Sequence, residues 1–209
     1  MKAVPTYSPQ GTPAQRADVL AFLNRIGIPC VEVDEVGASF LEGVAIRRGT
    51  LAVAPEASID SILHEAGHLA ITPTPFRTWL DGDVGRGQRR MIRAIEALDL
   101  EPDAPLMRAV LQSSDPEATA WAWAAGVHLG LPPELIVLDT SYDGEGAMVR
   151  LQLQHLAYIG IHGLCHAGMC QRGMLAQHRG VAPYPALSSW LQEASLPLPQ
   201  PTRRPTSAR

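Results

Sequence analysis

The spacing of apolar residues predicts that most of this chain is helical. Apolar side chains recur every three or four positions after Pro13, and again over residues 59–71 and 115–129, as they do on one face of an amphipathic helix. The first of these helices should end at Gly27, and Pro73 should prevent the second from continuing. These three segments are the strongest helical signals in the sequence.

Weaker patterns predict further helices near residues 88–98 and directly after Pro105. A longer pattern indicates one helix over residues 145–161, which would carry a single stripe formed by Leu151, His155, Tyr158 and His162. Residues 73–87 are instead rich in proline, glycine and aspartate. We expect a long loop there, and a loop of that length beside a functional site could act as a lid.

Short runs of apolar and β-branched residues predict strands between the first two helices. VEVD at 31–34 is followed by GVAIRRGTLAVAP at 43–55, in which Arg48 and Gly49 form a turn. We therefore expect an α+β fold, in which a small antiparallel sheet packs on a mainly helical domain.

Length and composition agree with one globular domain. The 209 residues are 46% apolar and 18% charged, which excludes a wholly disordered chain. We predict a single domain over residues 1–195 and a disordered, proline-rich tail over residues 196–209.

Charge and cysteine usage narrow the classes of function. The net charge of −4 gives no basic surface for direct binding of nucleic acid. No apolar run approaches the roughly 18 residues of a membrane span, and the first residues lack a secretion signal. Three cysteines are too few for a disulfide framework, so we expect a cytoplasmic protein.

The segment His64-Glu65-Ala66-Gly67-His68 has the H-E-x-x-H spacing of zinc hydrolases. On a helix, histidines four residues apart share one face, where both imidazoles can bind one tetrahedral Zn²⁺. Glu65 would lie beside the metal, where it can act as general base and take a proton from the attacking water. The motif therefore predicts a zinc-dependent hydrolase.

A catalytic zinc needs a third protein ligand. Residues 69–79 contain no histidine, so this ligand must lie further along the chain. Our first candidate is Glu117, because it begins a helix that can pack antiparallel to the motif helix. The helix dipole also favours an acidic residue in a first turn without any metal. The alternative ligands are Asp115, His128, Glu134, Asp139 and His155.

Hydrolysis of an amide also requires a group that stabilises the negative charge of the transition state. Tyr142, His155 and Tyr158 are the candidates, although the stripe that carries His155 and Tyr158 could equally be a face of the core.

A second set of metal-ligand residue types is found in the segment HGLCHAGMC, which contains His162, Cys165, His166 and Cys170. Its spacing is short enough to surround one structural zinc. The segment is apolar and glycine-rich, however, and free cysteines are often small buried hydrophobes. We interpret these residues as part of the core rather than as a second metal site or a Cys-His nucleophile.

Two segments, ILHEAGHLAI and EATAWAWAAGVHLGLP, resemble the ImmA/IrrE-type metallopeptidases. In that family H-E-x-G-H on one helix is followed by E-A-x-x-F-A and a turn that ends in proline. Glu117-Ala118 matches the glutamate and its small neighbour, and Trp121-Ala122 stands where Phe-Ala is usual. The resemblance implies a minimal gluzincin-like fold, a protein substrate such as a repressor, Glu65 as general base, and zinc held by His64, His68 and Glu117.

We therefore predict a zinc metalloprotease that hydrolyses peptide bonds of a protein. The alternative is a catalytically inactive zinc-binding module that regulates or holds a protein partner, which would not need Glu65. A third interpretation is a hydrolase of a non-peptide amide or ester.

Overall fold

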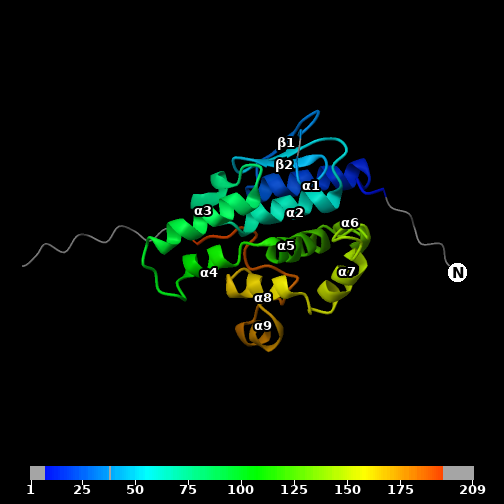
Figure 1. The fold of residues 1–209 in the computed structure, drawn as a ribbon. Coiled ribbons are helices and arrows are strands. Elements are labelled where there is room, and N and C mark those ends of the chain that lie inside the picture. The colour runs from blue at the N-terminus through cyan, green and yellow to red at the C-terminus, as the bar shows by residue number, and fades with distance from the viewer. Residues whose placement is uncertain (1–7, 38, 195–209) are drawn as a thin grey trace, which may run out of the picture.

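A computed structural model describes residues 8–37 and 39–194 (Figure 1). Its elements combine helices with one small sheet, which confirms the α+β class. In chain order they are α1 (Pro13–Ile26), β1 (Cys30–Glu32), β2 (Val44–Arg47), β3 (Thr50–Val53), α2 (Ile59–Ile71), the 3-10 helix η1 (Thr74–Trp79), α3 (Val84–Glu96), α4 (Pro105–Leu111), α5 (Asp115–His128), α6 (Pro133–Ile136), α7 (Gly146–Gln154), α8 (Ile159–His166) and α9 (Gly173–Arg179).

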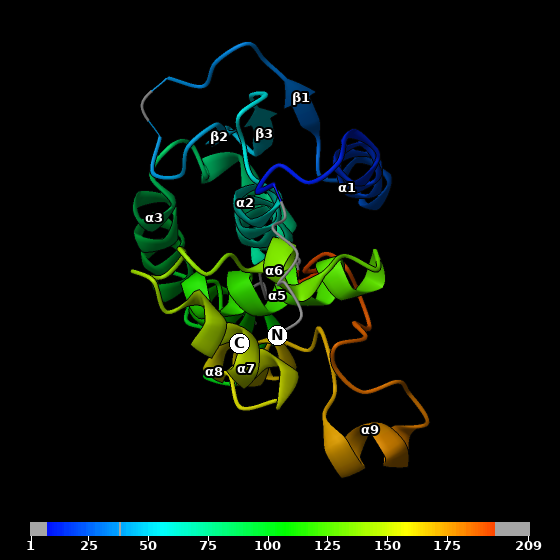
Figure 2. The same ribbon diagram turned by 90° about the vertical axis from the view of Figure 1, so that its right-hand side faces the viewer.

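These elements are stacked in layers (Figures 1 and 2). The sheet lies over α1 and α2, α5 lies on the opposite side of α2, and α8 lies beyond α5. Helix α2 packs more extensively on α5 than on any other element. The motif helix is therefore central in the stack, between the sheet and α5.

The sheet is mixed, so the prediction of an antiparallel sheet is correct for only one of its two strand pairs. Strands β2 and β3 form an antiparallel hairpin, and positive φ angles at Arg48 and Gly49 give the tight turn that suits its twist. Strand β1 pairs parallel to β3, in the order β1-β3-β2. The reason is that β3 folds back between β1 and β2, which a local sequence pattern does not reveal.

The segment predicted as a loop and lid is mostly helical. Residues 74–79 form η1, and α3 begins at Val84, four residues earlier than predicted. Arg77 fastens η1 to the core, because its guanidinium donates to the carbonyl oxygens of Leu69, Thr72 and Gln192 at 3.0–3.1 Å. These hydrogen bonds leave η1 little of the freedom that a lid needs.

The single helix predicted over residues 145–161 is wrong. Helix α7 ends at Gln154, Leu156 takes a left-handed conformation (φ 58°), and α8 begins at Ile159. The break lets α8 turn onto α5, where Gly160 is so close that a Cβ would lie 1.8 Å from the carbonyl oxygen of Pro116. Tertiary packing thus overrides the helical pattern, and the predicted stripe does not form.

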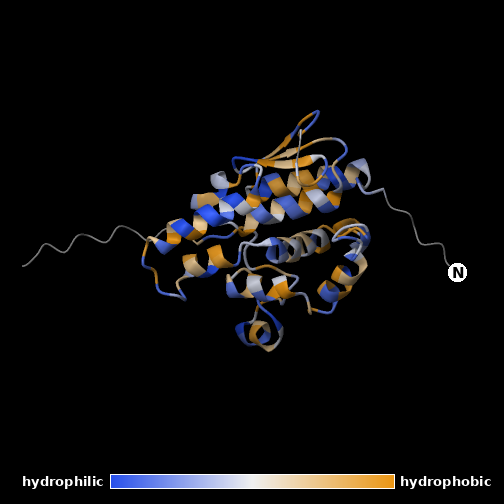
Figure 3. Ribbon diagram, viewed as in Figure 1, coloured by the Kyte–Doolittle hydropathy of each residue, from blue (hydrophilic) through white to orange (hydrophobic). Residues whose placement is uncertain are grey.

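The largest core cluster includes side chains from the sheet and from α1, α2, α5 and α8. Apolar residues gather toward the interfaces between these layers (Figure 3). Trp121 is fully buried there, and its indole nitrogen donates to the carbonyl oxygen of Trp190 at 2.9 Å. In the part of the chain that is described, no helix is both long and apolar enough to cross a membrane. The predicted disordered tail lies outside the described residues.

Candidate metal centre

Helix α2 holds the two motif histidines in fixed positions. The helix is capped at its start by Ser58, whose side chain accepts a hydrogen bond from the Ser61 amide. At its other end the Thr72 hydroxyl donates to the carbonyl oxygen of His68 at 2.7 Å. All residues of α2 except Ser61 and His64 are buried. A helix packed on nearly every side cannot rotate, so the direction of both imidazoles is set.

Gly67 allows α2 and α5 to approach at backbone distance. A Cβ at this position would lie 2.5 Å from the carbonyl oxygen of Ala118, closer than real contacts allow. Glycine is therefore required for this crossing. The close approach brings the first turn of α5 next to the histidines.

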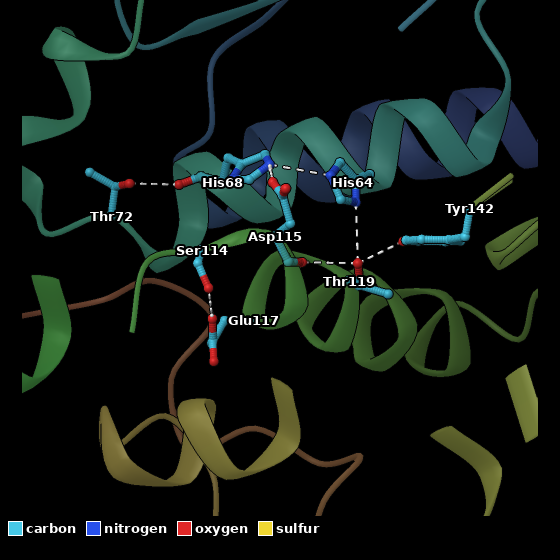
Figure 4. A network of polar contacts seen from close by, with 8 residues as sticks. All are labelled: His64, His68, Thr72, Ser114, Asp115, Glu117, Thr119 and Tyr142. Carbon is cyan, nitrogen blue, oxygen red and sulfur yellow. Dashed lines mark hydrogen bonds and ion pairs between the residues drawn. The ribbon is translucent and has the colours of Figure 1, made fainter. Parts of the chain in front are cut away.

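Three side chains converge between the two helices (Figure 4). Nε2 of His64 lies 3.2 Å from Nε2 of His68, which in turn lies 3.1 Å from Oδ1 of Asp115. One ligand atom from each residue lies within 4.8 Å of the other two. Among the described residues, no other three histidine, cysteine or acidic side chains come together in this way.

The group fits a tetrahedral divalent cation. Ligand atoms bound at about 2.0–2.1 Å around a tetrahedral zinc lie roughly 3.3 Å apart, close to both distances found here. Two imidazoles and one carboxylate also form a known donor set for catalytic zinc. The Asp115 side chain is 79% exposed, so this side of the group is open to solvent.

The structure does not bring Glu117, the first candidate for third ligand, to the histidines. Its carboxylate accepts a short hydrogen bond from Ser114 and lies against Gly163 of α8, on the far side of α5 (Figure 4). Asp115 and Thr119 lie one turn apart on the face toward α2, whereas residue 117 lies about 200° around the helix from Asp115. Asp115, one of the alternatives, occupies the expected position.

The other alternative ligands also lie outside this group. His128, at the end of α5, packs against the rings of Phe22 and Trp190 in tilted arrangements. Asp139 pairs with Arg150. Glu134 and His155 are exposed. Of the candidates for the third ligand, only Asp115 therefore remains.

Thr119 connects His64 with Tyr142. Its hydroxyl oxygen lies 3.4 Å from Nδ1 of His64 and 2.6 Å from the Tyr142 hydroxyl, and it donates its own proton to the carbonyl oxygen of Asp115 at 3.0 Å. The Thr119 hydroxyl is therefore within hydrogen-bonding distance of both the motif helix and the tyrosine.

Two of the three predicted transition-state stabilisers lie near this end of α5. Tyr142 contacts Thr119, and Tyr158 is the residue that precedes α8. Burial raises the pKa of both phenols, although a hydrogen bond with Thr119 opposes the shift in each. Both hydroxyls therefore keep their protons at neutral pH and can donate. His155 instead lies exposed at the end of α7.

The charges of the site suit metal binding and base catalysis. Desolvation and the neighbouring His68 lower the pKa of His64 to about 3, so this imidazole is neutral. A hydrogen bond from His68 lowers the pKa of Asp115, which keeps its carboxylate ionised. Glu65 is only 7% exposed, and burial raises its pKa, which makes its carboxylate a stronger base.

The second set of ligand-type residues does not converge. Cys165 and Cys170 have their sulfur atoms 3.2 Å apart, but His162 and His166 are exposed. The His162 ring lies against the Arg172 guanidinium at 2.6 Å. The positive charge of Arg172 beside His162 disfavours binding of a metal cation there.

Sequence reasoning missed the roles of Gly67 and Thr119. A signal for Thr119 was present, because Asp115 and Thr119 are four residues apart and share a helix face that Glu117 does not. No comparable signal exists for Gly67, since its contact with Ala118 depends on how two helices cross.

Comparison with known proteins assigns no family. No protein-family model matches the chain, and neither the curated proteins nor the solved structures contain a match. The resemblance to ImmA/IrrE-type metallopeptidases therefore stays a prediction, and the function has to be argued from the site.

Proposed function

We propose that this protein is a zinc-dependent metalloprotease. The observation that carries the proposal is the convergence of three side chains: His64 and His68, which flank Glu65 in α2, and Asp115 of α5. In this proposal the two imidazoles and the carboxylate hold Zn²⁺. When bound, the ion polarises the substrate carbonyl and lowers the pKa of water.

Glu65 is assigned the role of general base. It follows His64 directly in α2, and its carboxylate is buried with a raised pKa. Such a group takes a proton from attacking water more readily than an exposed glutamate, and can then pass it to the leaving amine. A purely structural metal site would not need this residue.

The role of stabilising the oxyanion of the transition state is assigned to a tyrosine hydroxyl, which would donate a hydrogen bond to it. Tyr142 and Tyr158 both remain protonated and both lie beside Thr119 on the α5 side of the site. A preorganised hydroxyl aimed at developing charge contributes more than one that must reorient. The 2.6 Å contact between the hydroxyl oxygens of Tyr142 and Thr119 holds the Tyr142 phenol in place beside the site.

We propose that the substrate is a protein and that the enzyme acts in the cytoplasm. The resemblance to ImmA/IrrE-type metallopeptidases suggests a regulatory protein such as a repressor as substrate. Three cysteines are too few for a disulfide framework, which suits a reducing compartment. Neither the net charge nor the composition supports direct binding of nucleic acid.

The test combines metal content with hydrolysis. Elemental analysis of the protein after zinc loading and removal of excess metal should give one zinc per chain. The loaded protein is then incubated with casein and with a peptide mixture of diverse sequence, and mass spectrometry is used to find new termini. Glu65→Gln is the matched control, because it keeps size and hydrogen bonding but removes the base.

We expect Glu65→Gln to keep its zinc and to lose at least about 100-fold in hydrolysis, the usual contribution of a positioned general base. Equal cleavage by both proteins would remove Glu65 from the mechanism. Zinc binding without cleavage by the wild type would favour the inactive zinc-binding module. Turnover of p-nitrophenyl acetate alone would favour the hydrolase of non-peptide esters.

A further inference from the structure

Two of the three cysteines are held together at the end of α8. The Cys165 thiol is half-buried in the last turn of the helix, and the Cys170 thiol is fully buried. Their sulfur atoms are 3.2 Å apart, and one thiol donates a hydrogen bond to the other. The proposed hydrolase does not use either residue.

Backbone contacts on both sides fix this pair. Gly168, with a φ of 83°, turns the chain back after α8, and the Met169 amide donates to the carbonyl oxygen of Leu164 at 2.9 Å. Cys170 then forms a β-bridge with Leu187. Since both cysteines are anchored by main-chain hydrogen bonds, the thiols meet without further ordering of the chain.

The surroundings make Cys165 the more reactive thiol. The hydrogen bond from Cys170 lowers the pKa of Cys165 by more than partial burial raises it, and the charge of Arg172 lowers it further. The same hydrogen bond and burial raise the pKa of Cys170. Cys30 is far from this arrangement in the chain, and desolvation raises its pKa to about 12. The molecule thus contains one activated thiol, one partner and one inert thiol.

We propose that Cys165 and Cys170 form a thiol–disulfide exchange site that accepts low-molecular-weight disulfides of the glutathione type. The Cys165 thiolate attacks one sulfur of the disulfide and displaces the first thiolate. Cys170 then attacks the Cys165 sulfur and displaces the second thiolate. The protein loses two hydrogens as a Cys165–Cys170 bond forms, and the two displaced thiolates take up the two protons to leave as thiols.

The test uses the full chain and oxidised glutathione as the probe. After brief incubation the reaction is quenched with acid, remaining thiols are alkylated with N-ethylmaleimide, and intact mass and peptide mapping are measured. We expect the mass of the reduced chain minus two hydrogens plus one N-ethylmaleimide, with a 165–170 cross-link, the alkylated residue at Cys30, and full reversal of the cross-link by dithiothreitol. Limiting iodoacetamide should label Cys165 at least about 10-fold faster than Cys30, as thiolate fraction dictates.

Variants separate this exchange from ordinary thiol chemistry. Cys30→Ser should still form the cross-link, whereas Cys170→Ala should stop at a stable glutathione adduct on Cys165. A wild-type protein that keeps the glutathione adduct, forms no adduct, or reacts equally at Cys30 would overturn the proposal. Because the main measurement is made on the wild type, a variant that fails to fold does not affect the result.

Discussion

The chain contains two pairs of histidines with the same helical spacing, and within the described residues only one pair is joined by a third side chain that could bind a metal. His64 and His68 of α2 face the first turn of α5, where Asp115 completes a group of three. His162 and His166 of α8 are also four residues apart, but both are exposed. Spacing along one helix therefore supplies two neighbouring imidazoles, and a side chain from a second element decides whether they can hold a metal.

The two helices differ in the face that they pack on α5. Helix α8 contacts α5 through Gly160 and Gly163. At 100° per residue, the average direction of these two glycines lies about a third of a turn around the helix from the average direction of the two histidines. Its histidine face is left toward solvent. Helix α2 is buried on almost all sides, so its histidine face must also meet a neighbour. Burial of the whole helix, rather than the motif alone, completes the site.

The largest effect is expected from removing one histidine of the pair that meets Asp115, which tests whether this pair binds the metal. His68→Ala leaves two ligands on an open surface, so we expect zinc content to fall from one per chain to nearly none. The loss in affinity should exceed the 10–100-fold typical of a residue that only supports a ligand. Isothermal titration with zinc measures it. Stoichiometric zinc in this variant would show that the metal binds elsewhere.

A pair of isosteric variants tests which carboxylate belongs to the site. Asp115→Asn removes the charge of a proposed ligand, so it should weaken binding of Co²⁺, followed by its visible absorption, by at least about 100-fold, the upper end for residues that only support a ligand. Glu117→Gln should leave the affinity and the spectrum nearly unchanged, since Glu117 points to Ser114 and α8. The reverse result would restore Glu117, the ligand implied by the family resemblance, and would require the first turn of α5 to rearrange when metal binds.

The contrast between these carboxylates shows what the sequence could predict. Three elements follow from local signals. Helix α1 lies between its capping residue Thr12 and Gly27, and α2 is capped by Ser58. The β2–β3 hairpin turns at Arg48 and Gly49. The i and i+4 histidines follow equally from local geometry. For these elements, the neighbours that fix the conformation lie within a few residues.

Other features depend on residues far apart in the chain. The parallel pairing of β1 depends on where β3 inserts, and the break after α7 depends on how α8 reaches α5. Choosing between Asp115 and Glu117 requires knowing which face of α5 meets α2. That face is set by the contact of Gly67 with Ala118, which no local pattern encodes.

A smaller effect is expected from the residue that orients His64. Thr119→Val keeps the shape of the side chain but removes the oxygen that contacts His64 Nδ1 and the Tyr142 hydroxyl. We expect zinc affinity to fall by about 10-fold, the low end for a residue that supports a ligand. Thr119→Ser keeps the hydroxyl and should restore most of the affinity. Equal losses in both variants would mean that packing, rather than the hydrogen bond, matters here.

The smallest effect is expected from the second pair of histidines. Replacing both His162 and His166 with alanine changes exposed side chains, so the free energy of unfolding should stay within about 0.5 kcal/mol of the wild type. Zinc content should remain one per chain, because Arg172 lies against the His162 ring and no carboxylate among the described residues completes this group. Urea unfolding and elemental analysis measure both quantities. Loss of a zinc here would show that spacing on one helix is sufficient for binding, and would remove the reason for giving Asp115 a decisive role.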